Sequence, residues 1–213
     1  MPSSTPPNDP AGPTSLRERR RRETWAALHR AAAEAALSGD ATASSVEAIA
    51  ATAGVSTRTF FNYFTSKDEA VYGYTEPHVP TEALERMGPS GDPVAQATEL
   101  LLATMRTSTP EGTPALRKQL IQTNPALGRF RLQALARSED LVIEALESRF
   151  ADDPRLADAP GGPAHALRMW ASLASAVLRH ATTDPDHVPG EALTPAAVRR
   201  SIDLFHHLLR SPE

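Results

Sequence analysis

The side chains best suited to chemistry in this sequence are Thr57, Arg58 and Thr59, which follow directly after Ser56. A serine at this place is a typical helix N-cap, so the three polar side chains would begin a short helix. A guanidinium can donate two parallel hydrogen bonds to guanine, and threonine can offer its methyl group to thymine or its hydroxyl to phosphate. The chemistry that this group predicts is recognition of DNA.

A second basic group lies near the N-terminus, where five of six consecutive positions are arginine: Arg17, Arg19, Arg20, Arg21 and Arg22. A run of like charges is often only a solvated helix face. Ahead of a helix that reads DNA, contact with phosphates or with the minor groove is the better interpretation. The chain has a net charge of −4, but residues 16–70 carry eight Lys and Arg against seven Asp and Glu, so the basic side chains lie at one end of a mildly acidic protein.

The arginines would lie on the first turns of a long helix. Ser15 and Glu18 have the form of a capping box, in which the serine and the glutamate each satisfy a free backbone amide. The helix should continue to about Ser38, because Gly39 can end it in the left-handed conformation. Residues 1–14, with five prolines, are expected to be a disordered arm.

Two short helices joined by a tight turn are expected between residues 44 and 64. Apolar residues recur at helical spacing, and Gly54 supplies the positive φ that the turn needs. Glu47 would complete a capping box on Ser44 at the start of the first helix, although Ser45 is an alternative cap. These features predict a helix-turn-helix, whose second helix, 57–64, enters the major groove of DNA.

A third capping box starts the helix that follows. Ser66 and Glu69 are its two members, and the helix should end near Thr75, before Pro77. Lys67 would lie on the first turn, where its ammonium group can pair with a phosphate.

The run SVEAIAATAGVSTRTFFNYFTSKDEAVYG resembles the DNA-binding domain of TetR-type transcriptional regulators. The resemblance implies base-facing positions at the start of the second short helix, phosphate contacts nearby and a helix-start hydroxyl at Ser45. Phe61 departs from the tyrosine of many members, so one phosphate contact would be missing. With the arginines and the outward-facing Asn62, the predicted DNA-binding residues are Arg19, Arg20, Arg21, Arg22, Ser45, Thr57, Arg58, Thr59, Asn62, Tyr63 and Lys67.

The whole chain is expected to be all-α, with about nine helices. Residues 15–76 would form the DNA-binding domain, and residues 77–213 a domain for effector binding and dimerisation. In the second domain a single turn of helix is expected at 82–87. Full helices are expected at 93–108, 115–122, 126–150 and 164–183, with a last one after Thr194-Pro195. The last two are rich in small and apolar residues, which suits a four-helix bundle with a second copy and a palindromic operator.

An apolar effector cavity is the second predicted site. The residues proposed to line it are Met105, Phe130, Met169 and Trp170, although methionine and tryptophan at helical spacing are also ordinary core residues. The segment NPALGRFRLQALARSEDLVIEAL is similar to the effector domains of TetR-type regulators proposed to sense acyl or other lipophilic metabolites. A small lipophilic effector is therefore expected, with its identity open.

Several other classes of function are not expected. The chain has no cysteine, and its adjacent histidines, His206 and His207, would point about 100° apart on a helix and could not share a face, so we predict no metal and no cofactor. No nucleophile–base motif or phosphate-binding glycine loop argues for an enzyme. No apolar run approaches the roughly 18 residues that a membrane span needs, and the N-terminus is polar, so a cytoplasmic protein without membrane contact is expected.

The sequence therefore predicts a ligand-responsive, sequence-specific transcriptional regulator. The simplest form is a repressor that binds palindromic double-stranded operator DNA as a homodimer and is released by a small-molecule effector. The alternative is a helical protein that sequesters a small molecule and keeps a vestigial DNA-binding head. The intact Ser56 cap, Arg58 and Lys67 argue against that alternative.

Overall fold

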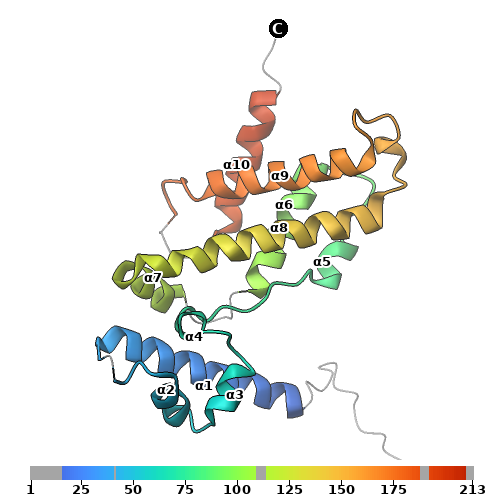
Figure 1. Cartoon of the computed structure of the whole chain (residues 1–213). Helices are drawn as coiled ribbons and strands as arrows, with labels where there is room; N and C mark the ends of the chain where they lie inside the picture. Colours follow the sequence, from blue (N-terminus) through green and yellow to red (C-terminus); the bar gives the residue numbers. More distant parts are fainter. Residues whose placement is uncertain (1–15, 41, 109–113, 188–191, 210–213) are drawn as a thin grey trace, which may run out of the picture. The chain divides into compact units, whose positions relative to one another are not determined.

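The computed structural model describes residues 16–40, 42–108, 114–187 and 192–209 (Figure 1). In these residues the chain forms ten α-helices and two short 3₁₀ helices, with no strand. The predicted all-α class is confirmed. The count exceeds the expected nine because the single turn suggested before Met87 is a helix of its own, α5, Thr81–Glu85.

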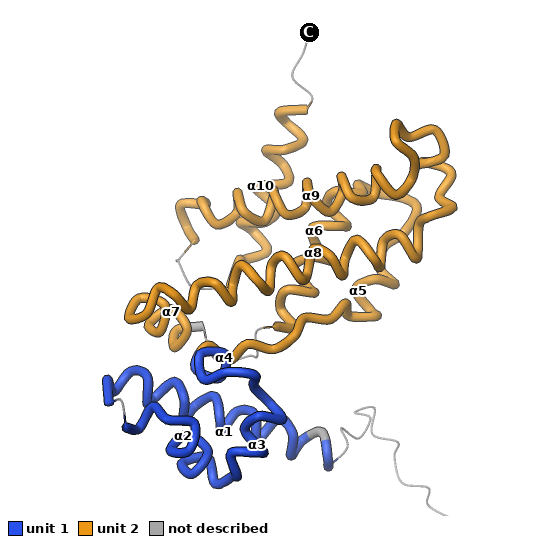
Figure 2. Tube along the Cα trace, viewed as in Figure 1, with its two compact units in different colours: residues 1–71 blue, residues 72–213 orange. Residues whose placement is uncertain are grey.

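The chain divides into two compact units, Met1–Val71 and Tyr72–Glu213 (Figure 2). The helices at the N-terminal end are α1, Leu16–Ser38; α2, Val46–Thr52; α3, Thr57–Phe61; and α4, Lys67–Tyr72. The predicted cap Ser15 and the predicted arm 1–14 lie outside the described residues.

The core of the N-terminal unit is built around one aromatic cluster. The side chains of Phe60 and Phe64 are almost completely buried, and the ring of Trp25 lies 5.8 Å from that of Phe64. Leu28 of α1 and Ile49 of α2 fill the space between the helices. This packing holds α3 against α1 and α2, and it leaves the opposite face of α3 to solvent.

In this unit the structure settles one open alternative and corrects two local predictions. Ser45, not Ser44, caps α2, because its hydroxyl accepts a 3.1 Å hydrogen bond from the amide of Ala48. The hydroxyl of Ser44 instead donates to the carbonyl of Ala35 in α1, so Glu47 completes no capping box on it. Helix α3 ends at Phe61 and not at residue 64, since Tyr63 closes a tighter turn on Phe60.

Gly54 has the predicted role in the turn between α2 and α3. Its φ of +72° lies in the left-handed region, and the amides of Gly54 and Val55 donate to the carbonyls of Ala51 and Ala50. A residue with a Cβ is strained in this conformation, which explains the glycine.

The C-terminal unit contains the longer helices. They are α5, already given; α6, Pro93–Thr107; α7, Pro114–Thr123; α8, Gly128–Phe150; α9, Pro163–Ala181; and α10, Pro195–Leu209, with 3₁₀ helices at Pro125–Leu127 and Pro154–Leu156. Asp92 caps α6 and Thr194 caps α10, each just before a proline at the first helical position, as predicted.

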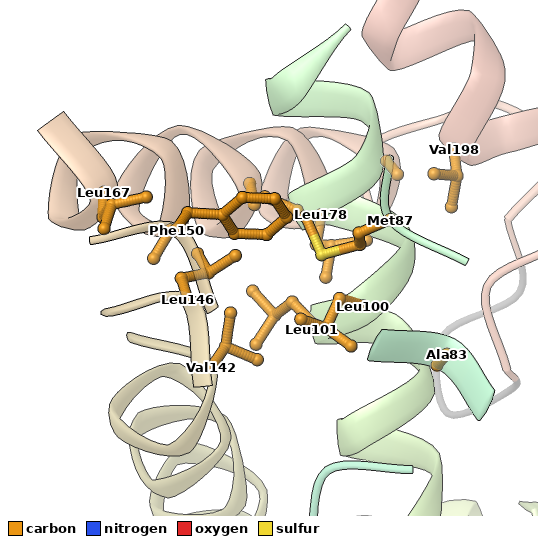
Figure 3. Packing of buried hydrophobic residues seen from close by; sticks show 14 of the residues in the cluster. Ala83, Met87, Leu100, Leu101, Val142, Leu146, Phe150, Leu167, Leu178 and Val198 are labelled. Carbon is orange, nitrogen blue, oxygen red and sulfur yellow. The ribbon is translucent and has the colours of Figure 1, made fainter. Parts of the chain in front are cut away.

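The core of the C-terminal unit lies where α6, α8 and α9 meet. Helices α8 and α9 run side by side, α6 packs against both, and α10 crosses α9 (Figure 1). Leucine and alanine side chains from these helices interdigitate with Met87 and Phe150 at the centre (Figure 3). Leu101 and Leu146 are completely buried there. Within the described residues, no helix is long and apolar enough to cross a membrane.

Candidate nucleic-acid interface

The start of α3 is organised by its serine cap. The hydroxyl oxygen of Ser56 accepts a 3.1 Å hydrogen bond from the amide of Thr59, and it also lies 2.9 Å from the hydroxyl of Thr59. The cap satisfies an amide that the helix itself leaves open, so this five-residue helix has a defined beginning. It also holds the Thr59 side chain in one orientation.

The predicted reading residues lie on the solvent side of α3. Thr57, Arg58 and Asn62 are exposed, whereas Thr59 and Tyr63 are half-buried. Phe60, between them, is completely buried, so the helix has one face in the core and one face available to a partner. Guanidinium, hydroxyl and amide groups on such a face are the donors that base edges and phosphates accept.

A groove of about 890 Å³ lies between the N-terminal half of α1 and the segment 59–63. We call it the α1–α3 groove. Its lining contains no carboxylate and only one aliphatic side chain; the residues are Leu16, Arg17, Arg20, Arg21, Thr24, Thr59, Asn62 and Tyr63. Three predicted reading residues and two predicted arginines are thus brought together on one surface.

The arginines of α1 divide into two groups. Arg20 and Arg21 line the groove, and so does Arg17, which the sequence interpretation left out of the DNA-binding set. Arg19 is exposed outside the groove lining and lies 3.9 Å from the carboxylate of Glu23. Arg22 is exposed and is also absent from the lining. Helical spacing could have predicted this division of the arginines, because positions 17, 20, 21 and 24 share one face of a helix.

The two remaining predicted DNA contacts lie at helix starts. Ser45 is half-buried and caps α2, as described above. Lys67 is exposed as the first residue of α4, whose cap is Ser66: its hydroxyl accepts from the amide of Glu69 at 3.1 Å. The carboxylate of Glu69 reaches back to Thr65 and not to Ser66, so the predicted capping box is formed one residue out of register.

The sequence of this unit matches a known family. The family model described as bacterial regulatory proteins of the tetR family matches residues 28–71. This range includes α2, α3, the C-terminal part of α1 and all but the last residue of α4. The chain is a TetR-family DNA-binding transcriptional regulator. A search of curated proteins finds no match to it.

In this TetR-family regulator the four predicted effector residues have different surroundings. Met105 and Trp170 are half-buried and pack against the same core cluster of the C-terminal unit. Phe130 is buried elsewhere, in contact with the rings of Tyr72 and Tyr74. Met169 is 50% exposed on α9. A small cavity of about 20 Å³ between α5 and α6 is lined by none of the four.

Burial shifts the pKa values of two neighbouring groups of the C-terminal unit, Tyr72 and Arg117. Burial raises the pKa of the Tyr72 hydroxyl, and the charges of Arg117 and Arg131 partly offset this effect. Burial lowers the pKa of the Arg117 guanidinium, and Tyr72 partly offsets it. In the described part of the regulator, no group of three or more His, Asp or Glu side chains is placed to hold a metal ion.

Proposed function

We propose that this regulator is a repressor that binds a palindromic operator as a homodimer in the cytoplasm and leaves it when a small lipophilic molecule binds the C-terminal unit. The observation that supports the DNA-reading role best is the start of α3. Ser56 caps the helix there, and Thr57 and Arg58 are exposed beside the half-buried Thr59. Arg58 would read guanine, while Tyr63, Lys67 and Ser45 would hold phosphates.

The reading role is tested by selecting duplexes from a random-sequence library with the full-length protein. We expect a palindrome to be enriched, because a two-fold dimer presents two identical heads. Replacing Arg58 by alanine should then relax the base preference at one position of each half-site, at a cost of about 1–3 kcal/mol. Arg30→Ala, an exposed arginine of α1 outside the α1–α3 groove, is the matched control and should leave the preference unchanged.

Failure of this test would favour a different function. If the wild-type protein binds every duplex alike at physiological salt, the operator-binding proposal is wrong. The rival is then a helical protein that sequesters a small molecule and has a vestigial head. Arg58→Ala would in that case change nothing measurable.

The exposed faces of α9 and α10 support the proposed dimer. Ser172 and Ala176 on α9 are exposed and small, which allows another helix to approach closely. Leu204 and Leu208 of α10 are 40% and 64% exposed, and the end of this helix projects beyond α9 (Figure 1). Burial of these apolar side chains against a second copy would stabilise the pair, since each leucine contributes about 1.5–3 kcal/mol when fully buried.

The dimer is tested by replacing Leu208 with glutamate. We expect analytical ultracentrifugation to find a dimer for the wild type and a shift toward monomer for Leu208→Glu, because the interface would bury an unpaired carboxylate. Leu132→Glu on α8 is the matched control, since Leu132 is 69% exposed and lies away from both helices in sequence. Equal masses for both variants and the wild type would contradict the proposal.

The proposed effector site is centred on Met105 and Trp170, because both pack on the core cluster of the C-terminal unit. Phe130 and Met169 remain predictions as further contacts. An effector releases the operator only if it binds the two conformations of the regulator unequally. Medium-chain fatty acids and their acyl thioesters are suitable first probes of a lipophilic site.

The effector proposal is tested by thermal unfolding and by operator release with the same probes. A ligand at 100 times its Kd should stabilise the folded protein by about 2.7 kcal/mol. Met105→Ala and Trp170→Ala should weaken both effects. A probe that stabilises the protein and leaves operator binding intact would contradict the proposed release.

A further inference from the structure

The arginines at the start of α1 are placed unfavourably for the helix itself. Cations near a helix N-terminus oppose the helix dipole, and Arg17 and Arg21 are four residues apart, so their like charges repel. The ion pair between Arg19 and Glu23 has the favourable spacing, but its two charged atoms are 3.9 Å apart and well exposed. A cluster that costs helix stability in this way is better explained by a partner that carries negative charge.

The α1–α3 groove has the composition of a site for a sugar–phosphate backbone. Pockets for small molecules are lined mainly by apolar and aromatic side chains. This groove is lined by three guanidinium groups on one side and by the polar side chains of Thr59, Asn62 and Tyr63 on the other. Arginine, threonine, asparagine and tyrosine are all common donors to DNA phosphates.

The groove is continuous with the reading face of α3. Thr59 belongs to both, because it follows Arg58 on the helix and also lines the groove. Thr57 and Arg58 themselves lie outside the lining. A duplex whose major groove receives the start of α3 would therefore have a phosphate strand next to Asn62 and Tyr63, opposite the arginines.

We infer that Arg17, Arg20 and Arg21 form a phosphate track that binds the DNA backbone beside the reading helix, whereas Arg19 and Arg22 do not contact DNA. This inference rests on the proposed operator binding. It assigns α1 a sequence-independent contribution to affinity, made from a rigid helix. It differs from an arginine arm in the minor groove, which would contribute to base preference.

The test compares single Arg→Gln variants of all five positions in the full-length protein. Affinity is measured by fluorescence anisotropy for a selected duplex and for a scrambled duplex, between about 50 and 200 mM salt. A substitution in the groove, Arg17→Gln, Arg20→Gln or Arg21→Gln, should make the slope of log affinity against log salt shallower by about 0.9 for each protomer bound to DNA. Arg19→Gln and Arg22→Gln are charge-matched controls and should keep the wild-type slope.

Two further results separate this inference from its rivals. The groove variants should weaken both duplexes by the same factor, because a phosphate contact carries no sequence information. Equal slope changes for all five variants would mean a diffuse charge effect, and a changed ratio between the duplexes would mean base contact; either overturns the inference. If the wild-type protein binds the selected and the scrambled duplex equally tightly, the proposed operator binding is refuted instead. Circular dichroism checks that the exposed substitutions leave the fold intact.

Discussion

The guanidinium of Arg117 is bound to Tyr72 in two ways. Its Nε donates a 3.0 Å hydrogen bond to the carbonyl oxygen of Tyr72, and its central carbon lies 4.9 Å from the centre of the Tyr72 ring. Nη2 donates a second hydrogen bond, of 2.6 Å, to the carbonyl of Gly73. Arg117 is 5% exposed, and in the described residues its hydrogen bonds go to carbonyls and not to a carboxylate. The ring of Tyr72 is also stacked on that of Phe130.

Replacing Arg117 by alanine should destabilise the C-terminal unit by about 3 kcal/mol, because two hydrogen bonds from a charged donor are lost and the carbonyls stay buried. Urea unfolding followed by the fluorescence of Trp170, in a Trp25→Phe background, reports on this unit. Arg117→Lys should recover less than half of the loss, since one ammonium cannot reproduce the planar fork. Gln119→Ala, an exposed residue of the same helix, is the control. Full recovery by lysine would contradict this account.

Replacing Ser56 by alanine should destabilise the N-terminal unit by about 1 kcal/mol through loss of the cap. It should also weaken DNA binding, because the Thr59 hydroxyl loses its 2.9 Å neighbour. Ser56→Asp keeps a capping acceptor and adds a negative charge next to the DNA. Stability should therefore return while DNA affinity stays low, as measured by thermal unfolding and by anisotropy. Recovery of both quantities in Ser56→Asp would argue that this helix start does not face DNA.

Gly54→Ala should cost about 1–2 kcal/mol, through backbone strain alone. No atom lies within 4 Å of an added Cβ at Gly54, so a steric clash does not contribute. Gly128→Ala is a sharp control, because its Cβ is equally unobstructed but its φ is −59°. That variant should be neutral or more stable by up to about 1 kcal/mol. The fluorescence of Trp25 and of Trp170 reports on the unfolding of each unit separately. An equal loss of stability in Gly54→Ala and Gly128→Ala would contradict the strain argument.

The ion pair of Asp184 with Arg200 should make the C-terminal unit sensitive to acid. Arg200 donates to both carboxylate oxygens, at 2.6 and 2.7 Å, and these bonds hold the pKa of Asp184 below its usual value. The stabilisation is complete above the ordinary pKa of about 3.9 and is lost as the pH falls through the lowered value. Asp184→Asn should flatten the pH dependence of unfolding below about pH 4. Asp203→Asn, an exposed change on α10, should leave it as in the wild type.

Local capping and turn chemistry could be predicted from the sequence. Gly54 adopts the expected left-handed conformation, and Ser56, Asp92 and Thr194 cap the helices that were expected to follow them. These features depend on residues within a few positions of one another, so a short segment of the sequence is enough to predict them. The error at Ser44 arose because that hydroxyl bonds to Ala35, nine residues away. Nothing in the spacing from Ser44 to Glu47 reveals this competitor.

The sequence by itself determined the class of the protein: an all-helical chain whose N-terminal helix-turn-helix belongs to the TetR family. The tertiary structure decided which side chains act together. The five arginines between positions 17 and 22 look alike in sequence, yet of these only Arg17, Arg20 and Arg21 line the α1–α3 groove, because the turn of the helix places the other two on different faces. It also placed Arg117 on the carbonyls of Tyr72 and Gly73, more than 40 residues earlier. Such contacts depend on how helices pack, which local periodicity does not specify.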